Sequence, residues 1–91
     1  MPGILDNILV LDLTRNVAGP FATMTLGDLG ARVIKIERPD TGDDTRHWRP
    51  PSWDDYSAIF LALNRNKQSL AIDLDDPEGR KVVRKLAEKA D

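Results

Sequence analysis

Residues 8–38 read ILVLDLTRNVAGPFATMTLGDLGARVIKIER, and this stretch predicts a strand, a loop, a helix and a second strand. The apolar run at 8–13, interrupted only by Asp12, is typical of a strand covered on both faces, as in a parallel sheet. A second apolar run predicts a strand at 32–37. A strand, a helix and a strand within about thirty residues form a βαβ unit with parallel strands.

The helix of this unit is predicted over 20–29. Pro20 is favoured at the first helical position, because the N–H group that it lacks would have no partner there. Gly30 suits the left-handed position that commonly follows a helix. Asp12 lies inside an apolar strand, and we expect it to be a hydrogen-bonded structural residue rather than a catalytic one.

The loops that follow parallel strands meet at one edge of the sheet, where a helix N-terminus favours anions. In the loop TRNVAGP, Ala18 and Gly19 allow a ligand to approach the backbone. Arg38 follows the second strand and can pair with a phosphate. The alternative is a plain connector and a solvated charge. The loop lacks both G-x-G-x-x-G and the P-loop Gly-Lys-Ser/Thr, which argues against the usual dinucleotide or ATP site.

The remaining chain predicts a third strand near 69–73 and helices near 56–63 and 77–90. We therefore expect an α/β fold with an open, mainly parallel sheet of about three strands and flanking helices. The cationic residues of the last helix are interpreted as a solvated face, because its apolar stripe lies on the other side.

The helix starts leave alternatives open. The helix at 56–63 has an N-cap candidate in Asp54, Asp55 or Ser57. The last helix begins either with Asp76 as N-cap and Pro77 first, or with a capping box from Asp75 to Glu78.

The irregular segment 39–55 contains both tryptophans and the only histidine. Arg46 and Arg49 are candidates for stacking on an adenine or pairing with a phosphate; the alternative is a surface flap whose tryptophans pack on their own domain. His47 has no acidic partner at helical spacing and is interpreted as solvated rather than as a base.

Composition excludes several classes. The 91 residues are 41% hydrophobic and 31% charged with net charge −2, which is typical of one small globular domain and gives no electrostatic case for nucleic acid. No apolar run approaches the roughly 20 residues of a membrane span, and no secretory signal is evident, so a cytoplasmic location is expected. Without cysteine and with one histidine, we expect no disulfide, no thiolate catalysis and no metal site.

Three blocks of sequence closely resemble the start of family III coenzyme A transferases, which include formyl-CoA transferases, carnitine-type CoA transferases and alpha-methylacyl-CoA racemases. The resemblance covers about residues 8–91. The blocks are A-G-P with G-D-L-G-A, K-x-E-R-P with G-D-D-T-R, and N-x-N-K with D-P-E-G, in this order along the chain.

The resemblance implies the N-terminal part of a doubly wound, Rossmann-like large domain and an interlocked homodimer. It also implies that coenzyme A or acyl-CoA binds in a groove formed by the loop after strand one, the Arg after strand two and the loop after strand three. Carried over by position, the groove residues are Val17, Ala18, Arg38, Ile72, Asp73, Leu74 and Asp75.

The resemblance also bears on chemistry. Formyl-CoA transferases have Gln and His where this chain has Val17 and Arg15, so oxalate or formyl chemistry is not supported. Transferases of the family use an Asp nucleophile, and racemases a His and an Asp, all downstream of residue 91. No catalytic residue is therefore assigned, and residues 1–91 are expected to be an N-terminal, CoA-binding segment that is inactive alone. The alternatives are a segment of a racemase, or a freestanding CoA- or nucleotide-binding or dimerisation module.

Overall fold

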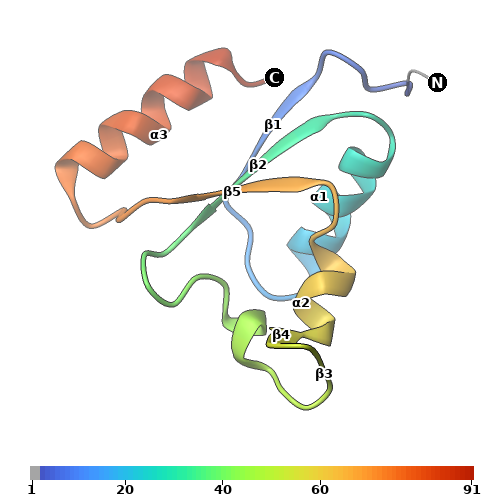
Figure 1. Ribbon diagram of the computed structural model, residues 1–91. Helices are drawn as coiled ribbons and strands as arrows, with labels where there is room; N and C mark the ends of the chain where they lie inside the picture. Colours follow the sequence, from blue (N-terminus) through green and yellow to red (C-terminus); the bar gives the residue numbers. More distant parts are fainter. Residues whose placement is uncertain (1–2) are drawn as a thin grey trace.

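A computed structural model describes residues 3–91 of the chain. Three strands form the main sheet in the order β1 (Leu9–Asp12), β2 (Arg32–Glu37) and β5 (Lys67–Ala71), and both pairings are parallel (Figure 1). The predicted α/β class and parallel sheet are thus confirmed. β5 begins two residues earlier than the predicted third strand, although the amide of Ile72 still donates to the carbonyl of Glu37 at 2.9 Å.

Three helices flank the sheet: α1 (Ala18–Asp28), α2 (Ala58–Leu63) and α3 (Pro77–Lys89). α1 begins two residues before the predicted Pro20, which becomes the third helical residue. Proline is tolerated there for the same reason as at the first position, because the first four N–H groups of a helix have no partner within it.

Of the alternative N-caps, the structure selects Ser57 for α2 and Asp76 for α3. The hydroxyl of Ser57 accepts from the amide of Phe60 at 3.3 Å, so α2 starts two residues later than predicted. The carboxylate of Asp76 accepts from the amide of Glu78 at 3.0 Å, with Pro77 first in the helix.

α1 and α2 contact each other, whereas α3 lies apart from them and contacts β1 (Figure 1). Beyond α3 the amide of Asp91 donates to the carbonyl of Leu9, and the Asp91 carboxylate accepts from the Leu9 amide, both at 2.9 Å. The chain therefore crosses from β5, at one edge of the sheet, to β1 at the other. Within residues 3–91, no helix has both the length and the apolar character needed to cross a membrane.

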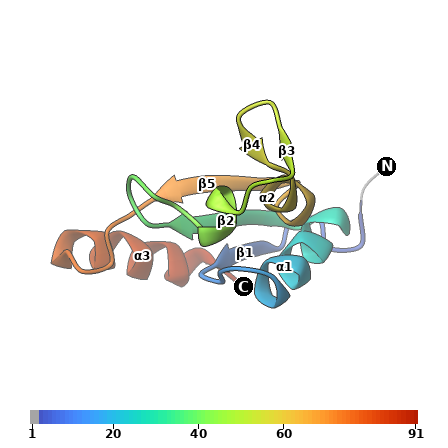
Figure 2. The ribbon, with the colours of Figure 1, turned by 90° about the horizontal axis from the view of Figure 1, so that it is seen from below.

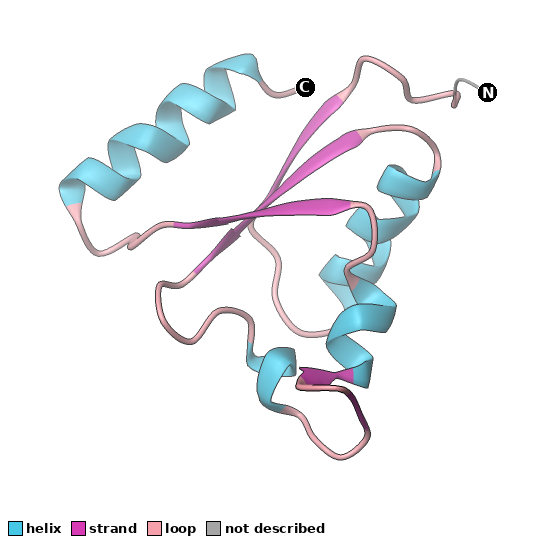
Figure 3. Ribbon diagram, viewed as in Figure 1, coloured by secondary structure: helices cyan, strands magenta, loops and turns pink. Residues whose placement is uncertain are grey.

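The segment between β2 and α2, here called the flap (residues 38–57), holds the 3₁₀ helix η1 (Asp44–His47) and the hairpin β3 (Ser52–Trp53) and β4 (Tyr56–Ser57) (Figure 3). The hairpin projects away from the main sheet (Figure 2). Trp53 in this hairpin is 72% exposed and Trp48 is 44% exposed. The alternative of tryptophans packed on their own domain therefore does not describe Trp53.

The core is small, and charged side chains share it. Its apolar members come from α1, β2, α2 and the residues just before β2 and just after β5: Met24, Ala31, Val33, Ile36, Phe60 and Ile72. Lys35 and Glu37 alternate with Ile36 along β2 and are just as buried as it is. Since β2 is the central strand, these charges must find partners inside the molecule.

Candidate functional site

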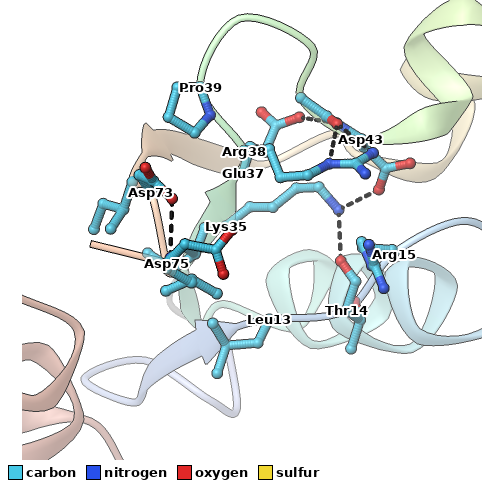
Figure 4. A pocket seen from close by; sticks show the side chains of 14 residues that line it. Leu13, Thr14, Arg15, Lys35, Glu37, Arg38, Pro39, Asp43, Asp73 and Asp75 are labelled. Atoms are coloured by element: carbon cyan, nitrogen blue, oxygen red, sulfur yellow. Dashed lines mark hydrogen bonds and ion pairs between the residues drawn. The ribbon is translucent and has the colours of Figure 1, made fainter. Parts of the chain in front are cut away.

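A cavity of about 330 Å³ opens at the carboxyl ends of the three parallel strands (Figure 4). Its wall combines the loop after β1, the end of β2 with the first part of the flap, and the loop after β5. The lining residues are Leu13, Thr14, Arg15, Lys35, Ile36, Glu37, Arg38, Pro39, Gly42, Asp43, Ile72, Asp73, Leu74 and Asp75. This is the edge at which ligands bind in open α/β sheets.

The structure brings five of the seven sequence-predicted groove residues together at this cavity: Arg38 and the run Ile72, Asp73, Leu74 and Asp75. Val17 and Ala18 lie at the start of α1 and are not part of the cavity wall. From the same loop, Thr14 and Arg15 line the cavity instead, because β1 ends at Asp12 and the chain turns there before α1 begins.

Arg38 lies at the mouth of the cavity with its side chain 46% exposed. Its guanidinium donates to the carbonyl of Gly42 at 3.0 and 3.3 Å and pairs with Asp44. Gly42 has a φ of +66°, and its amide donates back to the Arg38 carbonyl at 3.0 Å. The tight turn after β2 therefore sets the position of the Arg38 side chain.

Lys35 connects two walls of the cavity. Its ammonium group lies 2.8 Å from the carboxylate of Asp43 in the flap and donates to the carbonyl of Thr14 at 3.1 Å (Figure 4). Asp43 also accepts from the amide and hydroxyl of Thr45 at 2.9 and 2.8 Å. Burial raises the pKa of Asp43, but these hydrogen bonds and the charge of Lys35 outweigh it and hold the pKa below its usual value.

Asp12, the last residue of β1, holds the loop that follows this strand. Its carboxylate accepts from the amide and hydroxyl of Thr14 and from the hydroxyl of Thr23, and it lies 3.0 Å from the ammonium of Lys67. Burial raises its pKa, but these hydrogen bonds lower it to a greater extent. The structural role predicted for Asp12 agrees with this geometry.

The side chain of Lys67, at the start of β5, is only 2% exposed. It also donates to the carbonyl of Pro20 at 3.1 Å and to the side chain of Asn64 at 2.9 Å. Burial lowers the pKa of Lys67, and the neighbouring Asp12 offsets part of that effect. The ammonium group of Lys67 therefore ties the start of β5 to β1 through Asp12 and to α1 through Pro20.

Glu37 binds the flap to the end of β2. It accepts two hydrogen bonds from Arg46, at 2.8 and 2.7 Å, and one from the amide of Asp43 at 2.9 Å; the Ser69 hydroxyl also donates to it. Burial raises the pKa of Glu37, but these hydrogen bonds outweigh it and lower the pKa to about 2. The guanidinium of Arg46 lies 3.9 Å from the ring centroid of Phe60.

Both candidate arginines of the flap have partners within residues 3–91. Arg46 is engaged by Glu37 and Phe60, and Arg49 donates to the carbonyl of Asp55 at 2.9 Å. His47 is exposed, with Nε2 2.8 Å from the carbonyl of Thr41. In residues 3–91, no group of three or more His, Cys, Asp or Glu side chains is arranged to hold a metal ion.

One sequence pattern could have identified Lys35 and Glu37 as residues of the cavity wall. Lys35 and Glu37 interrupt an apolar strand at every second position, so both point to one face of a strand that is central in the sheet. Buried charges of this kind need partners. Those partners, Asp43 and Arg46, come from the flap, and no local pattern identifies them.

Residues 5–91, almost the whole chain, match the model of CoA-transferase family III. This chain belongs to CoA-transferase family III. The comparisons support its interpretation as an N-terminal segment of such a protein.

The relatives include succinyl-CoA:glutarate CoA-transferase of Mus musculus, 58% identical over 83 residues that cover 91% of this chain and 19% of that protein. The human protein of the same name is 55% identical over 87 residues, covering 96% of this chain and 20% of that protein. Among solved structures, a CAIB/BAIF family protein from Brucella suis superposes with a TM-score of 0.92 at 45% identity, covering 100% of this chain and 25% of that one. The chain thus spans about a fifth of the length of the two named transferases.

Proposed function

We propose that this chain forms the CoA-binding, N-terminal part of the large domain of an acyl-CoA:carboxylate CoA-transferase, with CoA lying across the carboxyl edge of the sheet. The observation that carries the proposal is the cavity there. It gathers Arg38 and the loop 72–75, which lie more than thirty positions apart in the sequence, next to the loop that leads into α1. Membership in CoA-transferase family III implies CoA or acyl-CoA as substrate.

In this proposal Arg38 binds a phosphate of CoA through its guanidinium fork. The start of α1, with Val17 and Ala18, supplies free amides and the positive end of the helix dipole. Two features of α1 support this. The N-cap residue Val17 makes no side-chain hydrogen bond to the first amides of the helix, and the first turn of α1 contains no acidic residue that would repel an anion. Residues 72–75 line the opposite wall.

We further propose dicarboxylic acids as the carboxylates between which CoA is transferred, because both named relatives act on succinyl-CoA and glutarate by their names. No residue of this chain is assigned to the covalent steps, and the nucleophile is expected in the part of the enzyme beyond residue 91. An interlocked homodimer and a cytoplasmic location stay predictions.

The test is an NMR titration of the 91-residue chain with CoA, comparing wild type, Arg38→Ala and the control Arg84→Ala. Arg84 is an exposed arginine of α3, away from the cavity. We expect weak wild-type binding of about millimolar strength, unchanged in the control and at least about tenfold weaker in Arg38→Ala. Shifts clustered on α3, or equal shifts in wild type and Arg38→Ala, would contradict the proposal.

A further inference from the structure

Three cationic side chains line the cavity, and they differ in what holds them. Lys35 pairs with Asp43 and Arg38 pairs with Asp44. Arg15 is exposed, and within residues 3–91 its guanidinium makes no hydrogen bond or ion pair. Among the described residues, Arg15 is therefore the cation of this cavity that a ligand can meet without displacing a partner.

The backbone around Arg15 is held on both sides. The residue before it, Thr14, is fixed by Asp12 through its amide at 2.8 Å and by Lys35 through its carbonyl at 3.1 Å. The amide of the residue after it, Asn16, donates to Asp43 at 3.3 Å. The buried ion-pair framework thus fixes the point from which the Arg15 side chain extends and leaves its guanidinium unpaired.

Figure 4 places Arg15 beside Thr14 and Asp43, on the other side of the cavity from Asp73 and Asp75. Arg38 enters from a different wall, at the end of β2. The cavity therefore presents two separate cations on two walls, which suits a ligand with two anionic parts.

We propose that Arg15 binds the free carboxylate of a dicarboxylic acyl group, and so selects dicarboxylic over monocarboxylic thioesters; this inference rests on the proposed function. A thioester uses one carboxylate of a dicarboxylic acid, and the other remains charged. Taking that charge out of water is costly unless a cation meets it. A guanidinium meets a carboxylate with two parallel hydrogen bonds, which a methyl group in its place cannot accept.

The test compares succinyl-CoA with butyryl-CoA, whose four-carbon acyl chain ends in a methyl group, and with CoA alone. The three ligands are titrated into the 91-residue chain by NMR. Wild type is expected to bind succinyl-CoA roughly fivefold more tightly than butyryl-CoA, because Arg15 is exposed and solvent screens its pair with a carboxylate. Arg15→Gln is expected to abolish this preference and to leave binding of butyryl-CoA and CoA within about twofold.

Arg84→Gln, which removes the same charge from α3, is expected to keep the full preference, and Arg15→Lys part of it. Because Arg15→Lys retains the charge, it also keeps the test decisive if Arg15→Gln fails to fold. If Arg15→Gln weakens all three ligands equally, Arg15 binds a phosphate of CoA and the inference is wrong. If wild type binds succinyl-CoA and butyryl-CoA equally, the inference falls while the proposed function stands. If wild type binds none of the three, both fall.

Discussion

Lys35 of β2 and Asp43 of the flap form an ion pair of 2.8 Å in which the two side chains are 2% and 0% exposed. The same ammonium group holds the carbonyl of Thr14 in the loop after β1. One buried contact thus joins the central strand, the flap and the loop that carries Arg15, which all contribute to the cavity wall.

Removing Lys35 should therefore be costly. Lys35→Met leaves the Asp43 carboxylate buried without its counter-charge, and we expect a loss of about 3 to 5 kcal/mol in the free energy of unfolding. Urea unfolding followed by circular dichroism measures it. The double variant Lys35→Met/Asp43→Asn should recover part of the loss, because the unpaired charge is gone. If the free energy of unfolding of Lys35→Met lay within about 1 kcal/mol of wild type, Asp43 would have to reach solvent.

Glu37 should make stability depend on acid pH. Its pKa of about 2 in the folded chain lies below the ordinary value of 4.5, so its ionised form stabilises the fold. The contribution is fully present above about pH 4.5 and is lost as pH falls towards 2; it amounts to at most about 3 kcal/mol. The stability difference between wild type and Glu37→Gln should shrink from pH 7 to pH 3. A Glu37→Gln difference that stays constant from pH 7 to pH 3 would refute the assignment.

Gly42→Ala should destabilise the turn that positions Arg38. Its φ is +66°, and an added Cβ would lie 2.8 Å from the side chain of Arg46 and 2.9 Å from that of Glu37. We expect a loss of about 1 to 3 kcal/mol, measured by urea unfolding. Asp40 in the same turn also has a φ of +66°. Asp40→Gly should therefore be neutral or slightly stabilising, and a loss as large as that of Gly42→Ala would argue against backbone strain as the cause.

Asp44→Asn should strengthen CoA binding if Arg38 binds a phosphate. Asp44 pairs with the guanidinium of Arg38, and its negative charge repels an incoming anion. Because this pair is about half exposed, we expect only a severalfold gain, roughly threefold, in an NMR titration with CoA. Asp54→Asn, in the turn between β3 and β4, serves as the charge-matched control and should leave affinity unchanged. An affinity that falls in Asp44→Asn would show that Asp44 positions Arg38 for the ligand.

The 91-residue chain should self-associate at high concentration. β5 has its outer edge free in the sheet order, and α3 has no buried residue and leaves Val82 45% exposed. Free strand edges and unpartnered apolar faces favour contacts between chains. Sedimentation velocity over a concentration series should show the weight-average mass rising. A monodisperse monomer with a cooperative melt at high temperature would instead favour a freestanding module.

The sequence by itself determined the alternation of strands and helices and the parallel sheet. Near-continuous apolar runs predict strands covered on both faces, and Asp76 with Pro77 marks a helix start, because these preferences act between near neighbours in the chain. They also placed Arg38 and residues 72–75 at one edge, since the carboxyl ends of parallel strands meet there. Element boundaries moved by about two residues where packing overrode local preference, as at Lys67.

Only the tertiary structure decided which charges face one another. Lys35 finds Asp43 in the flap, and Lys67 finds Asp12 across 55 positions of sequence. No local pattern encodes such pairs, because they depend on how the flap and α1 pack onto the sheet and on the cost of burying a charge alone. The same packing moved the cavity wall from Val17 and Ala18 to Thr14 and Arg15. This packing paired Lys35 with Asp43 and Arg38 with Asp44, and among the described residues it left the guanidinium of Arg15 without a partner.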